Sequence, residues 1–238
     1  MQVDSSEVTG FASRLCEFSP RMWDAEADAA ALIREKIEDL EVAAEEQEYA
    51  VSYPEYPVYE LEVDGEEIDC LPSGFVSGEI TEKRLIDNVA VAYGDIDEPN
   101  INFNPHCPGL SKQTFYEAPA LTVSREDVQK ILDADEVHGR LEVEWGRYTS
   151  RNFIVGNTED PDILVFTHYD SWWGGFVDNA FSVSLLLHLL PDLDLDRVCI
   201  VFAGSEEVSH EEHYWCYGYR QFEQEYFHTV EAADTIAV

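Results

Sequence analysis

Basic residues are scarce in this chain of 238 residues. Lysine and arginine together number 14, and only four of these are lysine, against 50 aspartates and glutamates, so the formal net charge is −36. A surface of this sign repels the phosphates of nucleic acids and the headgroups of anionic lipids. The composition therefore predicts that neither nucleic acid nor a membrane is a partner.

Long apolar runs, a leader sequence and paired cysteines are missing as well. No apolar run approaches the roughly 18 residues that span a bilayer, and the first ten residues, MQVDSSEVTG, have neither a basic segment nor an apolar core. We therefore expect no signal peptide. The five cysteines are odd in number and include no Cys-x-x-Cys pair, which favours reduced thiols. Together these absences predict a cytoplasmic protein.

The chain does contain enough apolar material for a folded core. Hydrophobic residues make up 45% and aromatic residues 12% of the sequence, which argues against the disorder that extreme acidity otherwise suggests. At molar salt the Debye length falls to about 3 Å, and repulsion between surface carboxylates is screened. We interpret the acidity as halophilic, an adaptation to a high-salt cytoplasm.

The most informative stretch is a strand, helix and strand pattern between residues 163 and 207. Residues 163–166 and 198–203 are short, continuously apolar runs, typical of parallel strands that are covered on both faces. Between them, apolar residues recur at helical spacing from Ala180, and Pro191 ends the pattern. Polar residues follow each strand, and ligands of open α/β sheets gather beyond the carboxyl ends of the strands. The pattern predicts an α/β fold with a site at that edge.

Three short motifs occupy these positions. They are His168-Tyr169-Asp170-Ser171 after the first strand, Gly175-Phe176-Val177-Asp178-Asn179 before the helix, and Glu206-Glu207 after the second strand. In this order and in these contexts, the motifs resemble metallopeptidase family 28, the co-catalytic zinc aminopeptidases. The resemblance implies a zinc-exopeptidase-like three-layer α/β fold with a central mixed sheet.

The resemblance also implies a role for each polar residue. His168 would bind one zinc ion, Asp178 would bridge two zinc ions, and Glu207 would bind a metal, since histidine nitrogens and carboxylate oxygens are zinc ligands. Glu206 would be the general base, and Asp170 would orient His168 by accepting a hydrogen bond from its other ring nitrogen. The complete family site holds two zinc ions.

Each motif also has a plain structural interpretation. A histidine at a strand end is often only hydrogen-bonded, Asp178 and Asn179 suit an Asx turn that caps the next helix, and Glu206 and Glu207 suit a surface pair in a glutamate-rich chain. The family resemblance implies instead that the side chains converge on one cavity. It also implies a cis peptide bond between Asp178 and Asn179.

Smaller elements are predicted from spacing and turn residues. Apolar residues at helical spacing between positions 8 and 18 predict a first helix, and Ser19 and Pro20 predict the N-cap and the first-turn proline of a second. Further along, the expected strands are 58–63, 74–80, 88–93, 119–123, 141–145 and 152–155, with a helix at 125–132 and a polar turn at 148–151.

The distribution of turn residues predicts a division of the chain into a catalytic domain and an insertion. Between residues 54 and 145, short strand-like runs are separated by Pro, Gly, Asn and Asp. This β-rich segment resembles the protease-associated module that many members of the family carry as an insertion. We predict a discontinuous zinc exopeptidase catalytic domain at 1–53 and 146–238, and an inserted protease-associated-like domain at 54–145.

The family needs two further metal ligands, an aspartate after the next core strand and a histidine considerably later. Residues 235–238 resemble the start of that strand, and the chain ends there, so we expect at most one weakly bound zinc and negligible activity from this chain alone. The leading hypothesis is a zinc-dependent exopeptidase of the aminopeptidase type that acts on peptide or aminoacyl substrates. The alternative is a truncated or inactive homologue that serves as a binding or structural module.

Overall fold

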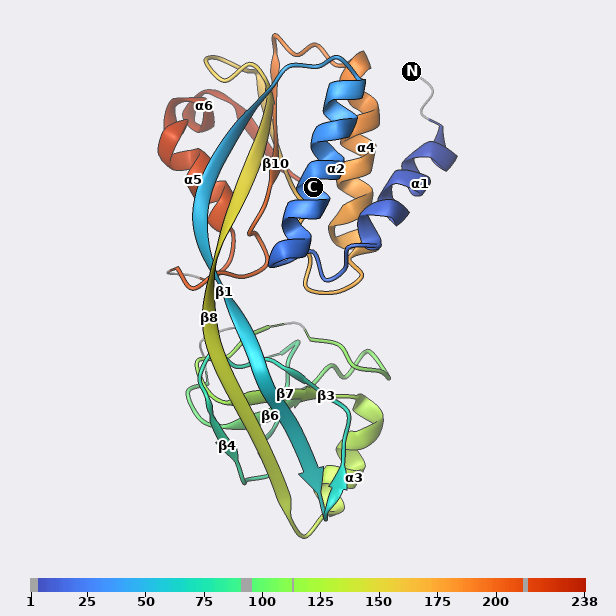
Figure 1. Cartoon of the computed structure of the whole chain (residues 1–238), viewed down its shortest axis with the longest axis vertical. Coiled ribbons are helices and arrows are strands. Elements are labelled where there is room, and N and C mark those ends of the chain that lie inside the picture. The colour runs from blue at the N-terminus through green and yellow to red at the C-terminus, as the bar shows by residue number, and fades with distance from the viewer. Residues whose placement is uncertain (1–3, 91–95, 113, 212–213) are drawn as a thin grey trace. The chain divides into compact units, whose positions relative to one another are not determined.

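The computed structural model describes residues 4–90, 96–112, 114–211 and 214–238 of the chain. The chain divides into two compact units (Figure 1), Met1–Tyr53 with Arg147–Val238 and, separately, Pro54–Gly146. Each unit has an apolar core of its own. Two strands of 20 residues, β1 (Ala44–Val63) and β8 (Val137–Gly156), contribute residues to both units.

Two helices begin the first unit. α1 (Ser5–Cys16) starts after Asp4, whose carboxylate accepts a hydrogen bond from the backbone N–H of Ser6, as an N-cap side chain does. The apolar face of α1 is buried, which confirms the first predicted helix. The second helix, α2 (Asp24–Asp39), buries a face of alanine, leucine and isoleucine.

The predicted start of the second helix is wrong. Ser19 and Pro20 are joined by a cis peptide bond and precede the helix, which begins only at Asp24. Between them, the backbone of Arg21 pairs with that of Ser171 in an antiparallel bridge. Because residue 21 is held by this pairing, the backbone does not become helical at the proline.

The central sheet of the first unit has the strand order β11-β9-β10-β8-β1. Its inner strands β9 (Ile163–His168) and β10 (Val198–Ala203) are parallel. β11 (Asp234–Ala237) is parallel to β9, whereas β8 is antiparallel to β10. The sheet is therefore mixed, which confirms the predicted α/β class with a central mixed sheet.

Helices cover both faces of this sheet (Figure 1). Along β10, Ile200 and Phe202 pack into an apolar cluster with α1, α2 and α4 (Phe181–Leu189), whereas Cys199 and Val201 pack into a second cluster with α5 (Tyr217–Glu225). This alternation is the two-residue period of a strand. The first unit thus has the predicted three layers, with the strand ends between them available to carry a site.

The helix predicted from Ala180 is present, and Pro191 lies in the short turn that ends it. None of the described helices combines the length and the apolar character that crossing a membrane requires. The helical elements after β9 are η2 (Phe176–Ala180), α4 (Phe181–Leu189), η3 (Leu190–Asp192), α5 (Tyr217–Glu225) and α6 (Phe227–Ala232).

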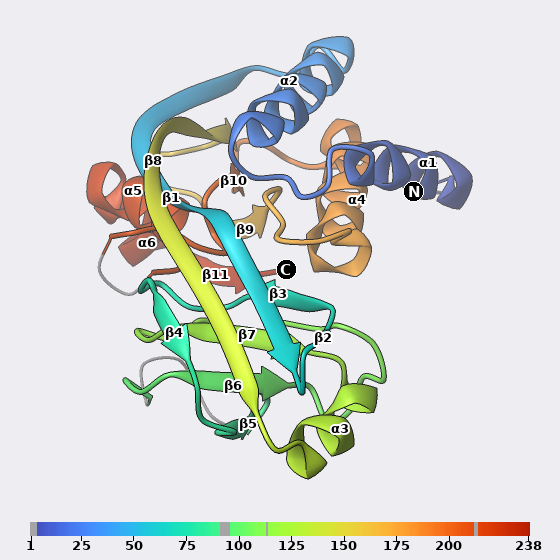
Figure 2. The ribbon, with the colours of Figure 1, turned by 60° about the horizontal axis from the view of Figure 1, so that its bottom comes forward.

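The second unit is rich in strands (Figure 2). A four-stranded sheet has the order β3-β7-β6-β5, and the parts of β1 and β8 in this unit pair with β2 and β4. Its elements are β2 (Glu66–Glu67), β3 (Cys70–Pro72), β4 (Gly78–Ile80), β5 (Leu85–Asp87), β6 (Asn100–Phe103), β7 (Ala120–Val123), η1 (Arg125–Asp127) and α3 (Val128–Asp133).

Some predictions for these strands are wrong. The expected strands 141–145 and 152–155 are present, but both belong to one continuous strand, β8, and the turn expected at 148–151 is wrong, because the polar middle of β8 is extended, with exposed and half-buried side chains. Of the strand expected at 88–93, the residues up to 90 form a turn in which Asp87 accepts hydrogen bonds from the backbone N–H groups of Val89 and Ala90. Residues 91–93 lie outside the described residues.

Candidate metal centre

Three side chains converge at the carboxyl ends of β9 and β10. His168 is the last residue of β9, Glu207 lies shortly beyond the end of β10, and Asp178 lies in η2. Because β9 and β10 are parallel, with Ala203 opposite His168, their ends meet at one edge of the sheet. One nitrogen of His168 and one carboxylate oxygen from each of the two acids lie within 4.8 Å of one another.

Asp178 faces His168 from an irregular turn. Oδ1 of Asp178 lies 3.1 Å from Nε2 of His168, and the peptide bond between Asp178 and Asn179 is cis, as the resemblance implies. The side chain of Asp178 is 78% exposed, whereas that of His168 is 8% exposed. The site is therefore open to solvent on the side of Asp178.

Asp170 is fully buried behind His168. Its Oδ1 lies 3.4 Å and its backbone carbonyl oxygen 3.3 Å from Nδ1 of His168. Both neighbours are acceptors, so Nδ1 is the nitrogen placed to donate toward Asp170, while Nε2 faces Asp178 and the site. Oδ2 of Asp170 accepts a hydrogen bond from the backbone N–H of Glu207 at 2.9 Å. One carboxylate thus orients two of the converging residues.

Glu206 lies beside the three converging side chains. Its Oε2 is 3.8 Å from Nε2 of His168, and its side chain is 23% exposed. Its Oε1 accepts a hydrogen bond from the thiol of Cys216 at 3.1 Å, and its backbone carbonyl accepts one from the N–H of Cys216 at 2.6 Å. The carboxylate is therefore fixed on one side while its other oxygen faces the site.

Burial and crowding of negative charge shift the pKa values of these groups. Burial, assisted by the charge of Asp170, raises the pKa of Glu207 to about 8, and burial also raises the pKa of Glu206. Burial opposes protonation of His168, but hydrogen bonds with Asp170 and Asp178 outweigh it and raise the pKa of the imidazole well above its usual value. The hydrogen bond with His168 lowers the pKa of Asp178. A divalent cation would offset this crowding of carboxylates.

The donor set fits a zinc ion. Zinc takes histidine nitrogen and carboxylate oxygen at about 2.0 to 2.2 Å, and donor atoms within 4.8 Å of one another reach such distances to a common point with small side-chain movements. In the described part of the chain, His168, Asp178 and Glu207 are the one group of this kind. They supply ligands for one ion, and a second ion would need further ligands.

A buried acid supports the turn that carries Glu206. Glu26 of α2 is 3% exposed and accepts hydrogen bonds from the hydroxyls of Tyr53 and Ser150. The hydroxyl of Tyr53 also lies 2.6 Å from that of Ser205, the residue before Glu206. This chain of hydrogen bonds links α2 and two strands of the sheet to the start of the Glu206 turn.

Sequence reasoning did not single out Glu26, although the helical phase of α2 contains the signal. Ala30 follows Glu26 by four residues, and Ile33 follows Ala30 by three. Both are buried, so all three residues share one helix face. An acidic residue in phase with a buried face predicts a buried carboxyl that is hydrogen-bonded.

A Glu26→Gln variant should become more stable relative to the wild-type protein as pH rises. Burial, with the charge of Asp170, raises the pKa of Glu26 from 4.5 to about 8. The unfolded chain therefore releases a proton at lower pH than the folded protein, and folding loses free energy between pH 4.5 and pH 8, by at most about 5 kcal/mol. Glutamine cannot ionise, so urea midpoints at pH 5 and pH 8 should favour the variant increasingly at the higher pH. Glu38→Gln, on the exposed side of the same helix, is the control, and identical pH dependence in both variants would contradict the prediction.

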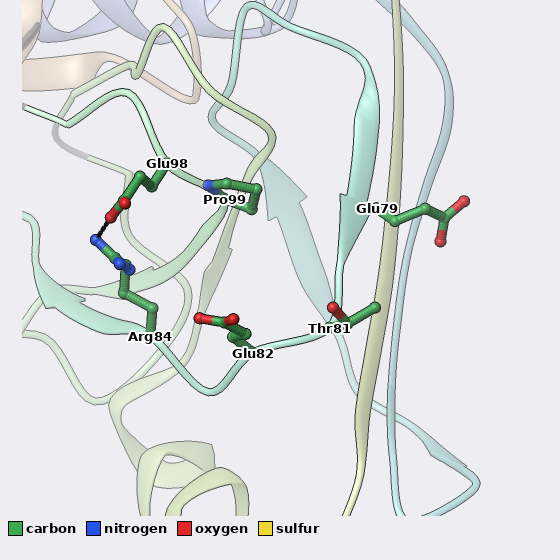
Figure 3. A pocket seen from close by; sticks show the side chains of 6 residues that line it. All are labelled: Glu79, Thr81, Glu82, Arg84, Glu98 and Pro99. Atoms are coloured by element: carbon green, nitrogen blue, oxygen red, sulfur yellow. Dashed lines mark ion pairs between the residues drawn. The ribbon is translucent and has the colours of Figure 1, made fainter.

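A pocket in the second unit offers no comparable chemistry (Figure 3). Arg84 forms an ion pair with Glu98 at its wall. Neither a histidine nor a cysteine is among the lining residues, which are Glu79, Thr81, Glu82, Arg84, Glu98 and Pro99. The convergence at His168 remains the candidate site.

Comparison with known proteins finds similarity at the level of structure. No family model and no curated protein sequence matches the chain. A zinc aminopeptidase from Bacillus subtilis superposes with a TM-score of 0.61 and 17% identity, over 87% of this chain and 62% of that protein. A peptidase M28 precursor from Shewanella amazonensis superposes with a TM-score of 0.69 and 18% identity, over 98% of this chain and 70% of that protein. An aminopeptidase from Aneurinibacillus superposes with a TM-score of 0.53 and 16% identity, over 86% of this chain and 63% of that protein.

These similarities show a shared fold. The chain spans less than two thirds of the length of the Bacillus and Aneurinibacillus enzymes. Its three-layer unit with a mixed sheet has the fold of M28-type zinc aminopeptidases.

Proposed function

We propose that the protein containing this chain is a zinc-dependent exopeptidase of the aminopeptidase type, which hydrolyses peptide or aminoacyl bonds. The observation that carries this proposal is the convergence of His168, Asp178 and Glu207 at one sheet edge, with Glu206 beside them. The similarity of the fold to zinc aminopeptidases supports it.

His168, Asp178 and Glu207 would hold the metal. Nε2 of His168 and one oxygen from each carboxylate would be the donor atoms, and Asp170 would keep the proton of His168 on Nδ1. A zinc ion held there would supply Lewis-acid chemistry, which polarises a carbonyl oxygen and makes water easier to deprotonate. Asp178 is the most exposed of the three side chains, and it would be the one to contact a second ion if the site held two.

Glu206 would move the proton. A general base must lie within reach of the water that attacks the carbonyl, and Oε2 of Glu206 faces the donor atoms while Oε1 is held by Cys216. The carboxylate would take a proton from the attacking water and deliver it to the nitrogen of the leaving amine. Burial raises the pKa of Glu206, and a higher pKa makes it a stronger base.

The surroundings of the site suit a substrate with a free amino end. The hydrogen bond with His168 keeps the pKa of Asp178 low, so this exposed side chain carries a negative charge at the open side of the site, which favours a positively charged α-amino group. Exposed apolar side chains precede and follow Asp178 in the chain, and they offer contacts for an apolar substrate residue. These are Trp173, Phe176, Val177 and Phe181.

The second unit, Pro54–Gly146, would be the inserted protease-associated-like module. It has its own apolar core and, among its described residues, no group of three metal-binding side chains. The proposed chemistry is therefore assigned to the first unit alone.

Zinc binding and zinc-dependent hydrolysis test the proposed function. The whole protein that contains this chain, freed of metal with a chelator in molar KCl, should bind zinc and should then hydrolyse leucine p-nitroanilide. N-acetyl-leucine p-nitroanilide should resist hydrolysis, because its nitrogen carries no positive charge and the acetyl group occupies the amino side. Bound zinc measured by atomic absorption and release of p-nitroaniline are the two readouts.

Two outcomes would count against the proposal. Hydrolysis that persists unchanged after the chelator would remove the metal from the reaction. Zinc binding without hydrolysis of any aminoacyl amide would favour the alternative, a homologue that serves as a binding or structural module.

A further inference from the structure

Arg21 is a fully buried arginine that contacts the segment between two candidate ligands. Its Nε donates a hydrogen bond to the carbonyl oxygen of Tyr169 at 2.6 Å, Nη1 to that of Gly174 at 3.2 Å, and Nη2 to that of Gly175 at 3.0 Å. One rigid, planar group thus holds both ends of this segment, which starts directly after His168.

The backbone of Arg21 contacts the same segment. Its carbonyl oxygen accepts a hydrogen bond from the N–H of Ser171 at 3.2 Å. Gly175 has a φ of +51°, and a Cβ built there would lie 2.6 Å from Nη2 of Arg21 and 2.0 Å from Oγ of Ser171. A glycine is therefore required at this position, because the guanidinium and the turn approach each other too closely for a side chain.

The guanidinium of Arg21 is buried, and no carboxylate among the described residues accepts its hydrogen bonds. A buried charge is expensive unless its donors are satisfied, and the acceptors described above are carbonyl oxygens rather than a carboxylate. The remaining contacts of Nη1 are with Oγ of Ser19 at 3.4 Å and Sγ of Cys16 at 3.9 Å.

We propose that Arg21 is a positioning residue for the metal centre, which fixes the segment 169–175 so that His168 and Asp178 converge on one ion. The inference rests on the proposed metal site. Asp178 is mostly exposed and lies on an irregular turn, so its position depends on how the preceding residues are held. Loss of a partner that orients a metal ligand typically changes metal affinity about 10-fold to 100-fold, and Arg21 would act in the same way through Tyr169, Gly174 and Gly175, which lie between the two ligands in the chain.

Cobalt binding provides the test, because Co²⁺ reports both affinity and ligand geometry through its visible absorption. Arg21→Met should weaken Co²⁺ binding about 10-fold to 100-fold and change the absorption spectrum of the bound ion. Arg21→Lys keeps the charge but cannot span the same carbonyls, and it should also weaken binding. Arg34→Met is the control, because Arg34 lies on α2 and pairs with Glu46 of β1, away from this segment. It should leave the Co²⁺ affinity and the absorption spectrum unchanged. All variants are measured in molar KCl at a temperature where circular dichroism shows them folded.

The outcomes separate the inference from the proposed function. If folded Arg21→Met and Arg21→Lys bind Co²⁺ with wild-type affinity and spectrum, Arg21 only stabilises the fold and the inference is overturned, while the metal site stands. If Arg21→Met does not fold, Arg21→Lys decides by the same criteria. Gly175→Ala disturbs the turn while keeping Arg21, and when folded it should show the same loss of Co²⁺ affinity. If the wild-type protein binds no more Co²⁺ than His168→Ala, the metal site fails and the inference fails with it.

Discussion

In the whole protein that contains this chain, a Glu206→Gln variant is expected to hydrolyse an aminoacyl amide about two to four orders of magnitude more slowly than the wild type. Glutamine keeps the size of the side chain and an oxygen that can accept the hydrogen bond from Cys216, but it cannot take a proton from water. Zinc content should hardly change, because Glu206 is not among the three converging donors. The measurements are kcat on leucine p-nitroanilide and bound zinc in the same preparation.

Glu223→Gln is the matched control, because Glu223 is exposed on α5. It should retain wild-type kcat. A Glu206→Gln variant with unchanged kcat would remove Glu206 from the mechanism, and one that loses its zinc would reassign Glu206 as a ligand.

Replacing His168 with alanine should weaken zinc binding by more than about 100-fold, beyond the range expected for contacts that act through a ligand. His168 supplies the one nitrogen among the three converging donor atoms. Without it, two carboxylates would remain, and zinc sites in proteins almost always use at least three protein ligands. Competition with a chromogenic zinc chelator measures the change in affinity.

His138→Ala provides the comparison for this variant, because His138 is an exposed histidine that pairs with Glu79 in the second unit. Its removal should leave zinc affinity unchanged. Equal affinities of His168→Ala, His138→Ala and wild-type protein would show that zinc, if bound, uses other residues.

The strand ends and the order of elements around the site could be predicted from the sequence for physical reasons. The runs that form β9 and β10 are short and apolar throughout, because both faces of these strands are covered by helices. The helix between them has regular apolar spacing and ends near a proline. Once two parallel strands are placed, the side chains at their carboxyl ends are placed with them, which is why the convergence of His168 and Glu207 could be expected.

Other features depend on contacts that are distant in the sequence. The polar middle of β8 resembles a turn in the sequence because it lacks apolar alternation, and only the place of β8 between β10 and β1 in the sheet identifies it as strand. The start of α2 was misplaced because Arg21 pairs with Ser171, about 150 residues away. The contacts of Arg21 with Gly174 and Gly175 leave no periodic pattern that a single sequence could reveal.

The candidate ligands lie outside the apolar clusters that hold the sheet and its helices together. His168, Asp178 and Glu207 are absent from both clusters of the first unit, whose members are strand and helix side chains. Under the proposed function, replacing one of these three residues would remove a metal ligand without opening a cavity in either cluster. A lineage could lose the reaction through one substitution at a strand end and keep a foldable scaffold. That scaffold would then be free to drift toward another ligand set, and descendants with the same architecture but different chemistry would be an expected product of gene duplication.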